Sequence, residues 1–410
     1  MRPAALIRLQ NEMTITELLR ADPARAADHL LPTLLRVIRS HLEMEVAFIS
    51  ELTAERRIFR HVDRVEGAPN LAVGGSDPLE DSYCVRVVDG RLPQLMRNAQ
   101  EIPAAAALAA TWTVPVGAHL SVPLRLSDGT VYGTFCCMSR RPDPSLTERD
   151  VAMMRAFAEL AATHIEGRLA QSRRLAQTRQ RVVSLLEDPS GLTSVYQPIQ
   201  DLAACAVAGF ECLSRFSAPP AQGPDVWFAE ATSVGLGSEL ELKAIATALQ
   251  GLHALEPGAY LSLNLSPSIP AEGLWALLAP WDKARLVLEI TEHEVIEQYD
   301  ALEHTLRPLR EHGVRVAVDD AGAGYASFRH ILRLRPDFIK LDLSLTRDID
   351  TDPARRALAA ALVRFAADTG SDIIAEGVET AAELRALRAL GISKAQGYYL
   401  GKPGALPRSR

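Results

Sequence analysis

Eight polar side chains in the second half of the chain stand at or near the ends of strand-like segments. The segments read GFECLSRF, LSLNLSPS, LVLEITEHE, VAVDDAGAG, FIKLDLS, IIAEGVET and KAQGYYLG, and the side chains are Glu211, Asn264, Glu289, Asp319, Asp320, Lys340, Glu376 and Gln396. Five of the eight are carboxylates, and the others are one amine and two amides. Oxygen ligands of this kind suit Mg²⁺ or Mn²⁺ rather than Zn²⁺ or iron. The residue types therefore predict a divalent-metal site.

The spacing of these groups predicts the elements that hold them. From Glu289 onward the gaps are 30, 21, 36 and 20 residues, the length of a strand, a helix and their loops. Alternating strand-like and helix-like stretches indicate a parallel α/β sheet or barrel. In an eight-stranded βα barrel, the strand ends meet at one mouth, so we expect the groups to lie close together. Five carboxylates converging there would repel one another without cations between them.

The first half reads as a separate α+β domain followed by a long helix. Asp188-Pro189-Ser190-Gly191 breaks this helix and marks a domain boundary. The helix, from about 146 to 187, could form a coiled coil, although three of its eleven heptad positions are polar; a final domain helix with an exposed linker is an equal alternative. The expected elements before it are a helix at 14–42, strands at 44–52 and 56–65, a helix, turn and strand within 81–99, and a hairpin at 116–140.

Composition limits the class of protein. A length of 410 residues allows two or three domains, and a net charge of -7 argues against a general nucleic-acid or membrane-surface binder. The sequence shows no secretory signal and no apolar run long enough for a transmembrane helix. Five cysteines without metal-ligand spacing indicate a reducing compartment. We therefore expect a cytoplasmic protein without a nucleic-acid polymer or a membrane as partner.

The order of elements in residues 14–168 resembles a GAF domain, a small-molecule sensing fold. The resemblance depends on MEVAFISEL, SYCVRVVDGRLP, VGAHLSVPLRLSDGTVYGTFCCMS and the closing helix. It implies an α+β sandwich that binds a cyclic nucleotide, haem, flavin, bilin or small metabolite, or that only dimerises. Cys84 is a candidate covalent or redox handle, and His119 is a candidate axial ligand or hydrogen-bond partner of a ligand, but a lone cysteine or histidine is more often structural.

Residues 189–410 resemble an EAL domain, the family of cyclic di-GMP phosphodiesterases. The signature Glu-Ala-Leu stands here as Glu211-Cys212-Leu213, after the opening segment VYQPIQDL. LNLSP, EITE, VDDAGAGYASF, PDFIKLD, AEGVET and AQGYYLGKP follow in the family's order. We therefore expect a (β/α)8 barrel at 189–410, a helical linker at 169–188 and a sensor domain at 14–168.

The resemblance implies a role for each matching residue. One metal ion would be held by Glu211, Asn264, Glu289 and Asp319, and a second by Asp319, Asp320 and Glu376. Lys340 and Gln396 would orient the attacking water, with Lys340 protonated among the carboxylates. Together with Glu211 and Glu376, these two residues form the predicted catalytic set. The expected cofactors are two Mg²⁺ or Mn²⁺ ions.

The remaining roles concern the substrate and the surroundings of the site. By resemblance, Gln197, Leu213 and Arg215 would bind cyclic di-GMP, and the Arg215 guanidinium would match a phosphate. Glu292 would anchor the loop after Asp320, while Asp342 and Glu379 would support the site from behind.

The sequence departs from the family in two places. Cys212 replaces alanine on the far face of its strand, and residues 319–327 read DDAGAGYAS where the family usually has DDFGTGYSS. In the family this loop couples the metal site to a dimer interface, so the change bears on regulation rather than on metal chemistry.

Three functions remain open from the sequence. The leading hypothesis is a homodimeric enzyme that opens cyclic di-GMP to linear pGpG under control of the GAF domain, whose ligand the sequence does not name. The alternatives are an inactive cyclic di-GMP receptor that signals to a protein partner, and an unrelated metal-dependent barrel hydrolase.

Overall fold

The computed structural model describes residues 23–291, 299–321 and 325–406, without the side chains of 23–28 and 325–328. Its contacts divide the chain into two compact units, residues 1–173 and 174–410. Helix α6, Glu148–Glu187, contributes residues to both units. Among the described residues, the helices are too short or too polar to cross a lipid bilayer.

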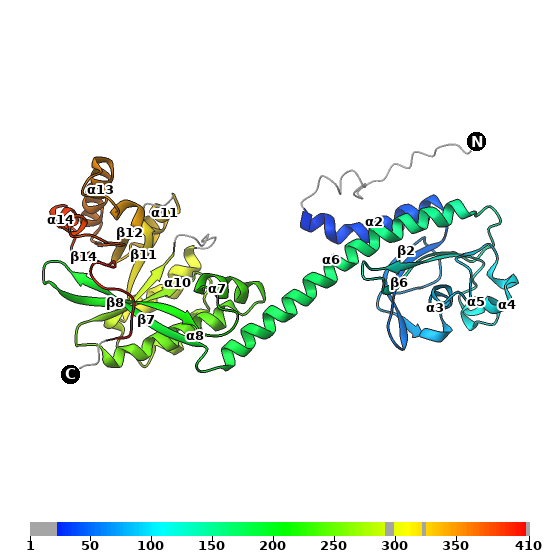
Figure 1. Ribbon diagram of the computed structural model, residues 1–410, viewed down its shortest axis with the longest axis horizontal. Coiled ribbons are helices and arrows are strands. Elements are labelled where there is room, and N and C mark those ends of the chain that lie inside the picture. The colour runs from blue at the N-terminus through cyan, green and yellow to red at the C-terminus, as the bar shows by residue number, and fades with distance from the viewer. Residues whose placement is uncertain (1–22, 292–298, 322–324, 407–410) are drawn as a thin grey trace. The chain divides into compact units, whose positions relative to one another are not determined.

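The first unit is built on a six-stranded antiparallel sheet (Figure 1). Its strand order is β3-β2-β1-β6-β5-β4, with β1 Val46–Leu52, β2 Arg56–Arg64, β3 Ser76–Pro78, β4 Leu95–Met96, β5 Ala118–Arg125 and β6 Val131–Ser139. The helices are α2 Pro23–His41, α3 Tyr83–Val88, α4 Pro103–Ala106, α5 Ala109–Thr113 and the first part of α6, with short 3-10 turns at Leu79–Asp81 and Ala99–Glu101.

Strand alternation gives this sheet two buried faces. Ala47 and Ile49 of β1 pack with α2 and α6, whereas Val46 and Phe48 pack with the α3 side. Successive side chains of a strand point to opposite faces, so the apolar run of β1 is buried on both. The α+β domain expected from the sequence is confirmed, with helices covering both faces of one sheet.

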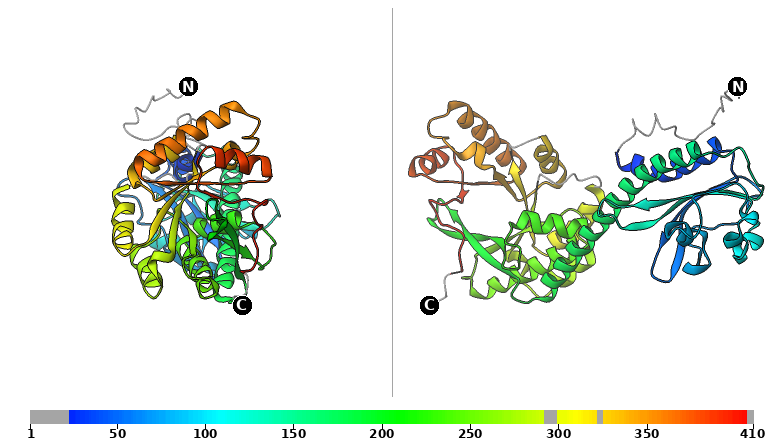
Figure 2. Two further views of the ribbon diagram at one scale, coloured as in Figure 1. Left: turned by 90° about the vertical axis from the view of Figure 1, so that its left-hand side faces the viewer. Right: turned by 45° about the vertical axis from the view of Figure 1, so that its right-hand side comes forward.

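The second unit is a closed eight-stranded barrel, whose strands can be followed in Figures 1 and 2. The strands are β7 Leu192–Asp201, β8 Ala206–Phe216, β9 Tyr260–Leu265, β10 Leu286–Ile290, β11 Arg315–Ala321, β12 Phe338–Leu341, β13 Asp372–Ala375 and β14 Lys394–Ala395. The described helices around them are α7 Pro224–Ser233, α8 Gly237–Leu249, α9 Ala271–Leu278, α10 Tyr299–Glu311, α11 Tyr325–Leu334, α12 Leu343–Thr346, α13 Pro353–Thr369 and α14 Ala381–Ala389, with 3-10 turns at Gln250–Ala254 and Lys283–Arg285.

One strand departs from the expected all-parallel barrel. β7 runs antiparallel to both of its neighbours, β14 and β8, while the neighbouring strands from β8 to β14 pair in parallel. β7 and β8 are joined by a short turn rather than by a helix, which allows antiparallel pairing. The start of β7 therefore lies at the same end of the barrel as the carboxyl ends of the other strands.

An apolar layer fills the barrel below this end. It consists of Ile199, Tyr260, Val287, Ala317, Phe338 and Ile374, and the rings of Tyr260 and Phe338 stack with their centroids 5.7 Å apart. Because side chains on one face of a strand recur every second residue, the positions two residues further on also point into the barrel. Those positions are Ser262, Glu289, Asp319, Lys340 and Glu376. The polar mouth is therefore supported by the apolar layer beneath it.

Candidate active site

Lys340 lies at the centre of a ring of carboxylates at the mouth of the barrel. Its Nζ lies 2.8 Å from Glu289 Oε2, 2.8 Å from Glu376 Oε1, 3.0 Å from Asp319 Oδ1 and 3.7 Å from Glu211 Oε1. Lys340 is fully buried. Burial alone would lower the pKa of this amine, but the four carboxylates, Asp319 foremost, outweigh it and hold that pKa well above its usual value. The side chain is therefore a permanent cation.

Gln396 joins two of these carboxylates. Its Nε2 donates to Glu211 Oε2 at 2.6 Å and to Glu376 Oε1 at 3.0 Å. Its amide oxygen is buried and has no hydrogen-bond partner within the described residues. This oxygen can therefore accept a hydrogen bond from a water molecule or another donor at the mouth.

Glu289 is the most deeply buried carboxylate of the ring. Oε2 accepts from Lys340, and Oε1 accepts a short hydrogen bond from the Ser262 hydroxyl of neighbouring strand β9. Burial raises the pKa of Glu289 to about 7; Lys340 opposes the rise, and Glu211 and Asp319 add to it. Burial also raises the pKa of Glu376 well above its usual value, with contributions from Asp319 and Glu211. The two raised pKa values reflect burial first and repulsion among the carboxylates second, because one ammonium does not balance four carboxylates.

Asp319 and Glu376 of this ring, together with the neighbouring Asp320, form a group that suits a metal ion. One oxygen of each lies within 4.8 Å of the others. The Asp320 backbone adopts φ +54°, an uncommon region for a residue other than glycine, and its N–H donates to Asp319 Oδ1 at 3.0 Å. All three side chains are only partly buried. The donor set, oxygen atoms with excess negative charge, fits a hard divalent cation.

The remaining predicted metal ligand, Asn264, and the predicted substrate contacts differ in how far they are exposed to solvent. Asn264 of β9 is exposed and lies directly beside Glu289 in the register of β9 and β10. Gln197 faces Glu211 across the β7–β8 pair, and its Nε2 donates to the Gly401 carbonyl at 3.3 Å. Leu213 is partly buried on β8. Arg215, two residues beyond Leu213, is exposed, and its Nη1 donates to the Ser214 carbonyl at 2.8 Å.

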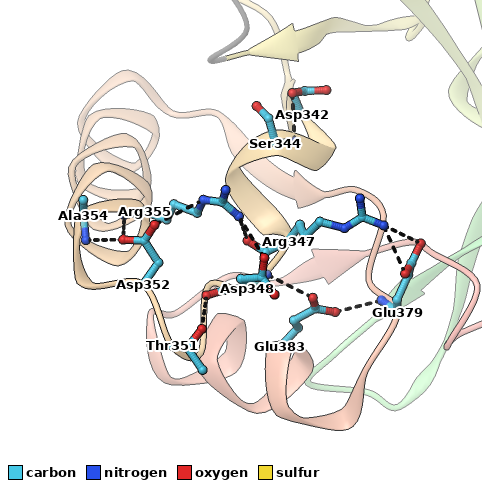
Figure 3. Close-up of polar contacts among 10 residues, drawn as sticks. All are labelled: Asp342, Ser344, Arg347, Asp348, Thr351, Asp352, Ala354, Arg355, Glu379 and Glu383. Carbon is cyan, nitrogen blue, oxygen red and sulfur yellow. Dashed lines mark hydrogen bonds and ion pairs between the residues drawn. The ribbon is translucent and has the colours of Figure 1, made fainter.

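Asp342 and Glu379 lie outside the ring, in a network of helix caps and ion pairs (Figure 3). Asp342 is the N-cap of α12 and accepts from the Ser344 N–H at 2.9 Å. Glu379 is exposed, pairs with Arg347 at 3.4 Å, and its N–H donates to Glu383. Among their described hydrogen bonds and ion pairs, neither carboxylate contacts a member of the ring. Both residues help to fix the loops after β12 and β13, and their support of the site stays a prediction.

Two of the sequence expectations fall on residues without a described position. Glu292, expected to anchor the loop after Asp320, lies outside the described residues, as do Gly322, Ala323 and Gly324 of the altered loop. Cys212 is buried in the cluster between the barrel and its outer helices, on the opposite face of β8 from Glu211.

Two residues at the site were not predicted. Ser262 was readable from the sequence, because it stands two positions before Asn264 on the same strand and shares its face. Glu241 of α8 accepts from the Ser266 N–H at 2.6 Å and so holds the loop that follows Asn264. No sequence signal indicated Glu241, because the contact joins a helix surface to a distant loop.

Two family models match the chain. A model described as an EAL domain matches residues 182–403, and one described as a GAF domain matches residues 24–166. The first of these covers more than half of the chain.

Curated relatives match about half of the chain. The cyclic di-GMP phosphodiesterase PA2567 of Pseudomonas aeruginosa is 31% identical over 250 residues, which cover 56% of this chain and 42% of that protein. The uncharacterized protein sll1895 of Synechocystis is 30% identical over 221 residues, covering 51% of this chain and 32% of that protein. The chain thus spans less than half the length of these relatives.

Solved structures share the fold. The PaMucR phosphodiesterase in complex with c-di-GMP is 25% identical, with a TM-score of 0.50 over 57% of this chain and 98% of that one. The EAL enzyme Bd1971, in a cAMP- and cyclic-di-GMP-bound form, is 17% identical, with a TM-score of 0.54 over 88% of this chain and 91% of that one.

Proposed function

The chain belongs to the EAL-domain family, and we propose that its barrel hydrolyses cyclic di-GMP to the linear dinucleotide pGpG with the help of divalent cations. The observation that carries the proposal is the ring of Glu211, Glu289, Asp319 and Glu376 around Lys340, with Asp320 beside it. A relative that matches 56% of the chain is named a cyclic di-GMP phosphodiesterase, which supports the choice of substrate.

In this proposal two cations would be held at the mouth of the barrel, and Asp319 would contribute to both positions. Asp320 and Glu376 would complete one position, and Glu211, Asn264 and Glu289 the other. When bound, such ions would neutralise the non-bridging phosphate oxygens and lower the pKa of a water molecule. Mg²⁺ and Mn²⁺ are the proposed ions, because every ligand offered is an oxygen atom.

The chain's own side chains would orient the reactants. The Lys340 ammonium lies within 3.0 Å of Glu289, Asp319 and Glu376 and so limits the repulsion among these three carboxylates. Gln396 offers its amide oxygen to an attacking water while its nitrogen holds Glu211 and Glu376. Arg215 stands exposed on β8, where its fork of donors can hold a phosphate of the substrate.

The direct test is a turnover assay on the full chain. Purified protein is incubated with cyclic di-GMP and Mg²⁺ or Mn²⁺, and products are separated by chromatography. We expect linear pGpG, loss of product formation in EDTA, and recovery after excess metal is added. Tight binding of cyclic di-GMP without a linear product would instead identify a receptor and overturn the proposed reaction.

The substrate assignment needs its own comparison. Bis(p-nitrophenyl) phosphate carries a phosphodiester but none of the guanine or ring geometry of cyclic di-GMP. We expect turnover of cyclic di-GMP to exceed that of this generic diester by a large factor at equal concentration. Comparable rates for the two compounds would indicate an unspecific metal-dependent hydrolase.

The proposal extends to regulation and assembly. The GAF domain would sense a small ligand and act through α6 on the barrel, in a homodimer formed through both domains and the helix. A cytoplasmic location, predicted from the cysteines, belongs to the same proposal. Dimerisation is tested by light scattering on the full chain, where a mass equal to one chain would contradict it.

A further inference from the structure

A buried group of polar side chains lies between α3 and the sheet of the first unit, away from the proposed active site. Its centre is a pair of cysteines, Cys84 of α3 and Cys136 of β6, whose Sγ atoms are 3.9 Å apart. Both are fully buried and both are free thiols. Around them stand Ser50, Arg57, Ser121 and Thr134. Four hydroxyl or guanidinium groups around two thiols are unusual in a domain core, where free cysteines usually behave as small apolar residues.

The two sulfurs have different partners. Arg57 Nη1 lies 3.6 Å from Cys84 Sγ, and the Ser50 hydroxyl lies 3.5 Å from it. Arg57 is held in place by its ion pair with Asp77 and by the Phe59 ring, whose centroid lies 4.4 Å from the guanidinium carbon. No described guanidinium or ammonium bonds to Cys136, which contacts the hydroxyls of Ser121 and Thr134 at 3.1 Å. The arrangement favours a thiolate at Cys84 and a thiol at Cys136.

The effect of burial on these thiols agrees with this assignment. Burial alone raises the pKa of Cys84, but the Cys136 thiol, the Arg57 charge and the Ser50 hydroxyl together bring it well below its ordinary value. Burial raises the pKa of Cys136 well above its ordinary value, and the neighbouring Cys84 adds to the rise. One sulfur is thus suited to attack, and the other to remain protonated.

The adjacent Cys137 provides an internal contrast. Strand alternation turns it to the other face of the sheet, where its Sγ lies 3.7 Å from Met154 Sδ in an apolar cluster. Burial raises its pKa, and none of its described hydrogen bonds comes from a hydroxyl or a cation. Cys137 has the surroundings of an inert core cysteine and Cys84 does not.

We propose that Cys84 and Cys136 form a redox-active pair that a small hydroperoxide converts into a disulfide. The Cys84 thiolate attacks the terminal oxygen of the hydroperoxide; the O–O bond breaks, an S–O bond forms, and the alkoxide or hydroxide that leaves takes a proton from solvent. The sulfur of Cys136 then attacks the sulfenic acid, forms the S–S bond and releases the hydroxyl with the Cys136 proton as water. The pair loses two electrons and the peroxide gains them.

The geometry sets how far the two sulfurs must move and limits the size of the oxidant that can reach them. A disulfide is about 2.05 Å long, so the sulfurs must approach by about 1.9 Å. Cys84 is carried by a helix of six residues, Tyr83–Val88, rather than by a strand within the sheet. Because neither sulfur is exposed, hydrogen peroxide or a small organic hydroperoxide is the class of oxidant that can reach them, in preference to bulky disulfides.

The test maps the disulfide in the full chain. A Cys205→Ser background removes the exposed cysteine. Reduced protein is treated with a slight excess of hydrogen peroxide, quenched with catalase, unfolded, alkylated and digested with trypsin. We expect the peptide 65–86 to be linked to the peptide 126–140, with loss of the link on reduction. Both peptides recovered fully alkylated, at the level of untreated protein, would overturn the proposal.

Variants identify the sulfurs, because Cys136 and Cys137 share one peptide. Cys137→Ser should keep the link and Cys136→Ser should lose it. In Cys136→Ser, the Cys84 sulfenic acid should be trapped by dimedone. A link that survives Cys136→Ser and disappears in Cys137→Ser would contradict the assignment. Mapping in the background protein does not depend on either variant, so a variant that fails to fold leaves the test intact.

Discussion

At the mouth of the barrel, one ammonium group faces four carboxylates. Lys340→Met removes that cation and leaves Glu289 and its neighbours buried without their partner. Breaking a buried pair in this way costs about 3–5 kcal/mol. In EDTA we expect the variant to melt about 10 °C below the unaltered chain, since 1 kcal/mol corresponds to about 2–4 °C in a domain of this size. Scanning fluorimetry measures the difference.

The same experiment tests the metal site. Mn²⁺ should raise the melting temperature of Lys340→Met more than that of the unaltered chain, because a divalent cation replaces part of the missing charge. Lys394→Met is the matched control, since Lys394 pairs with the single, exposed carboxylate of Asp372. The Lys394→Met substitution should lower the free energy of unfolding by no more than about 1 kcal/mol. Equal shifts with Mn²⁺ in all three proteins would show that the ring does not hold the metal.

His119 gives the first unit a predictable response to pH. Burial and the charge of Arg57 lower the pKa of His119 to about 3, whereas an unfolded histidine titrates near 6.5. As pH falls below 6.5, the unfolded chain gains a proton that the folded chain does not, so stability is lost. Between about pH 7 and about pH 5, the free energy of unfolding should fall by about 2 kcal/mol for this reason. His119→Phe should remove that part of the loss in urea unfolding; an unchanged pH dependence would contradict it.

At the scale of elements, strand alternation explains how the residues of the site could be predicted. The positions of Glu289, Asp319 and Lys340 follow from strands whose carboxyl ends share one mouth, and Ser262 follows from the same rule. The direction of β7 did not follow, because the uniform strand–helix expectation overlooked the short turn before β8. The helix caps at Asp342 and at Thr380 with Glu383 were not predicted, although both have local sequence motifs that could have indicated them. Contacts between distant elements, such as Glu241 with Ser266, have no local signal.

Helix α8 connects the end of α6 to the loop beside a proposed metal ligand. Lys243 Nζ donates to the carbonyls of Leu185, Leu186 and Asp188 at 2.6–2.9 Å. Two residues earlier on the same helix, Glu241 holds the Ser266 N–H. A shift of α6 at this end would therefore act on α8, and α8 would act on the loop after Asn264.

This connection yields a prediction for Glu241→Ala. The substitution leaves the Ser266 N–H without its carboxylate partner, at a cost of about 1–3 kcal/mol. Loosening the support of a metal ligand typically lowers metal affinity about 10–100-fold. The Mn²⁺ concentration for half-maximal turnover should rise accordingly. Glu239→Ala, at an exposed position of the same helix, is the control, and coincident titrations for the two variants would refute the role of Glu241.

At the scale of the whole molecule, α6 is the covalent route between two units. Residues 171–177 of this helix are exposed, so insertions there disturb neither core. Two inserted alanines rotate the helix after the insertion by about 200°, whereas seven rotate it by close to two full turns. If α6 carries a signal, the insertion of two alanines should change turnover about fivefold or more, and the insertion of seven should leave turnover close to that of the unaltered chain. Equal turnover in both variants and the unaltered chain would contradict signalling through the helix.

Sequence reasoning had its clearest limit at this same scale. Motifs predicted a sensor-like domain, a long helix and a barrel, because each has a local pattern of strands, turns or helical spacing. They did not indicate that Cys84 and Cys137 differ, because this contrast depends on the contacts of Cys84 with Arg57 and Ser50 from other parts of the chain. Those side chains come together only when the sheet is assembled.

The most direct measurement is the rate of pGpG formation from cyclic di-GMP by the full chain and by Glu211→Gln, each with saturating Mn²⁺. Glu256→Gln, at an exposed position of the same unit, is the matched control. Glu211 contacts Gln396 and Lys340 and is a proposed metal ligand, so its amide should reduce turnover by at least about 10³-fold, a loss of about 4 kcal/mol of transition-state stabilisation. Glu256→Gln should retain full activity. Turnover in Glu211→Gln equal to that in Glu256→Gln would contradict the proposed site.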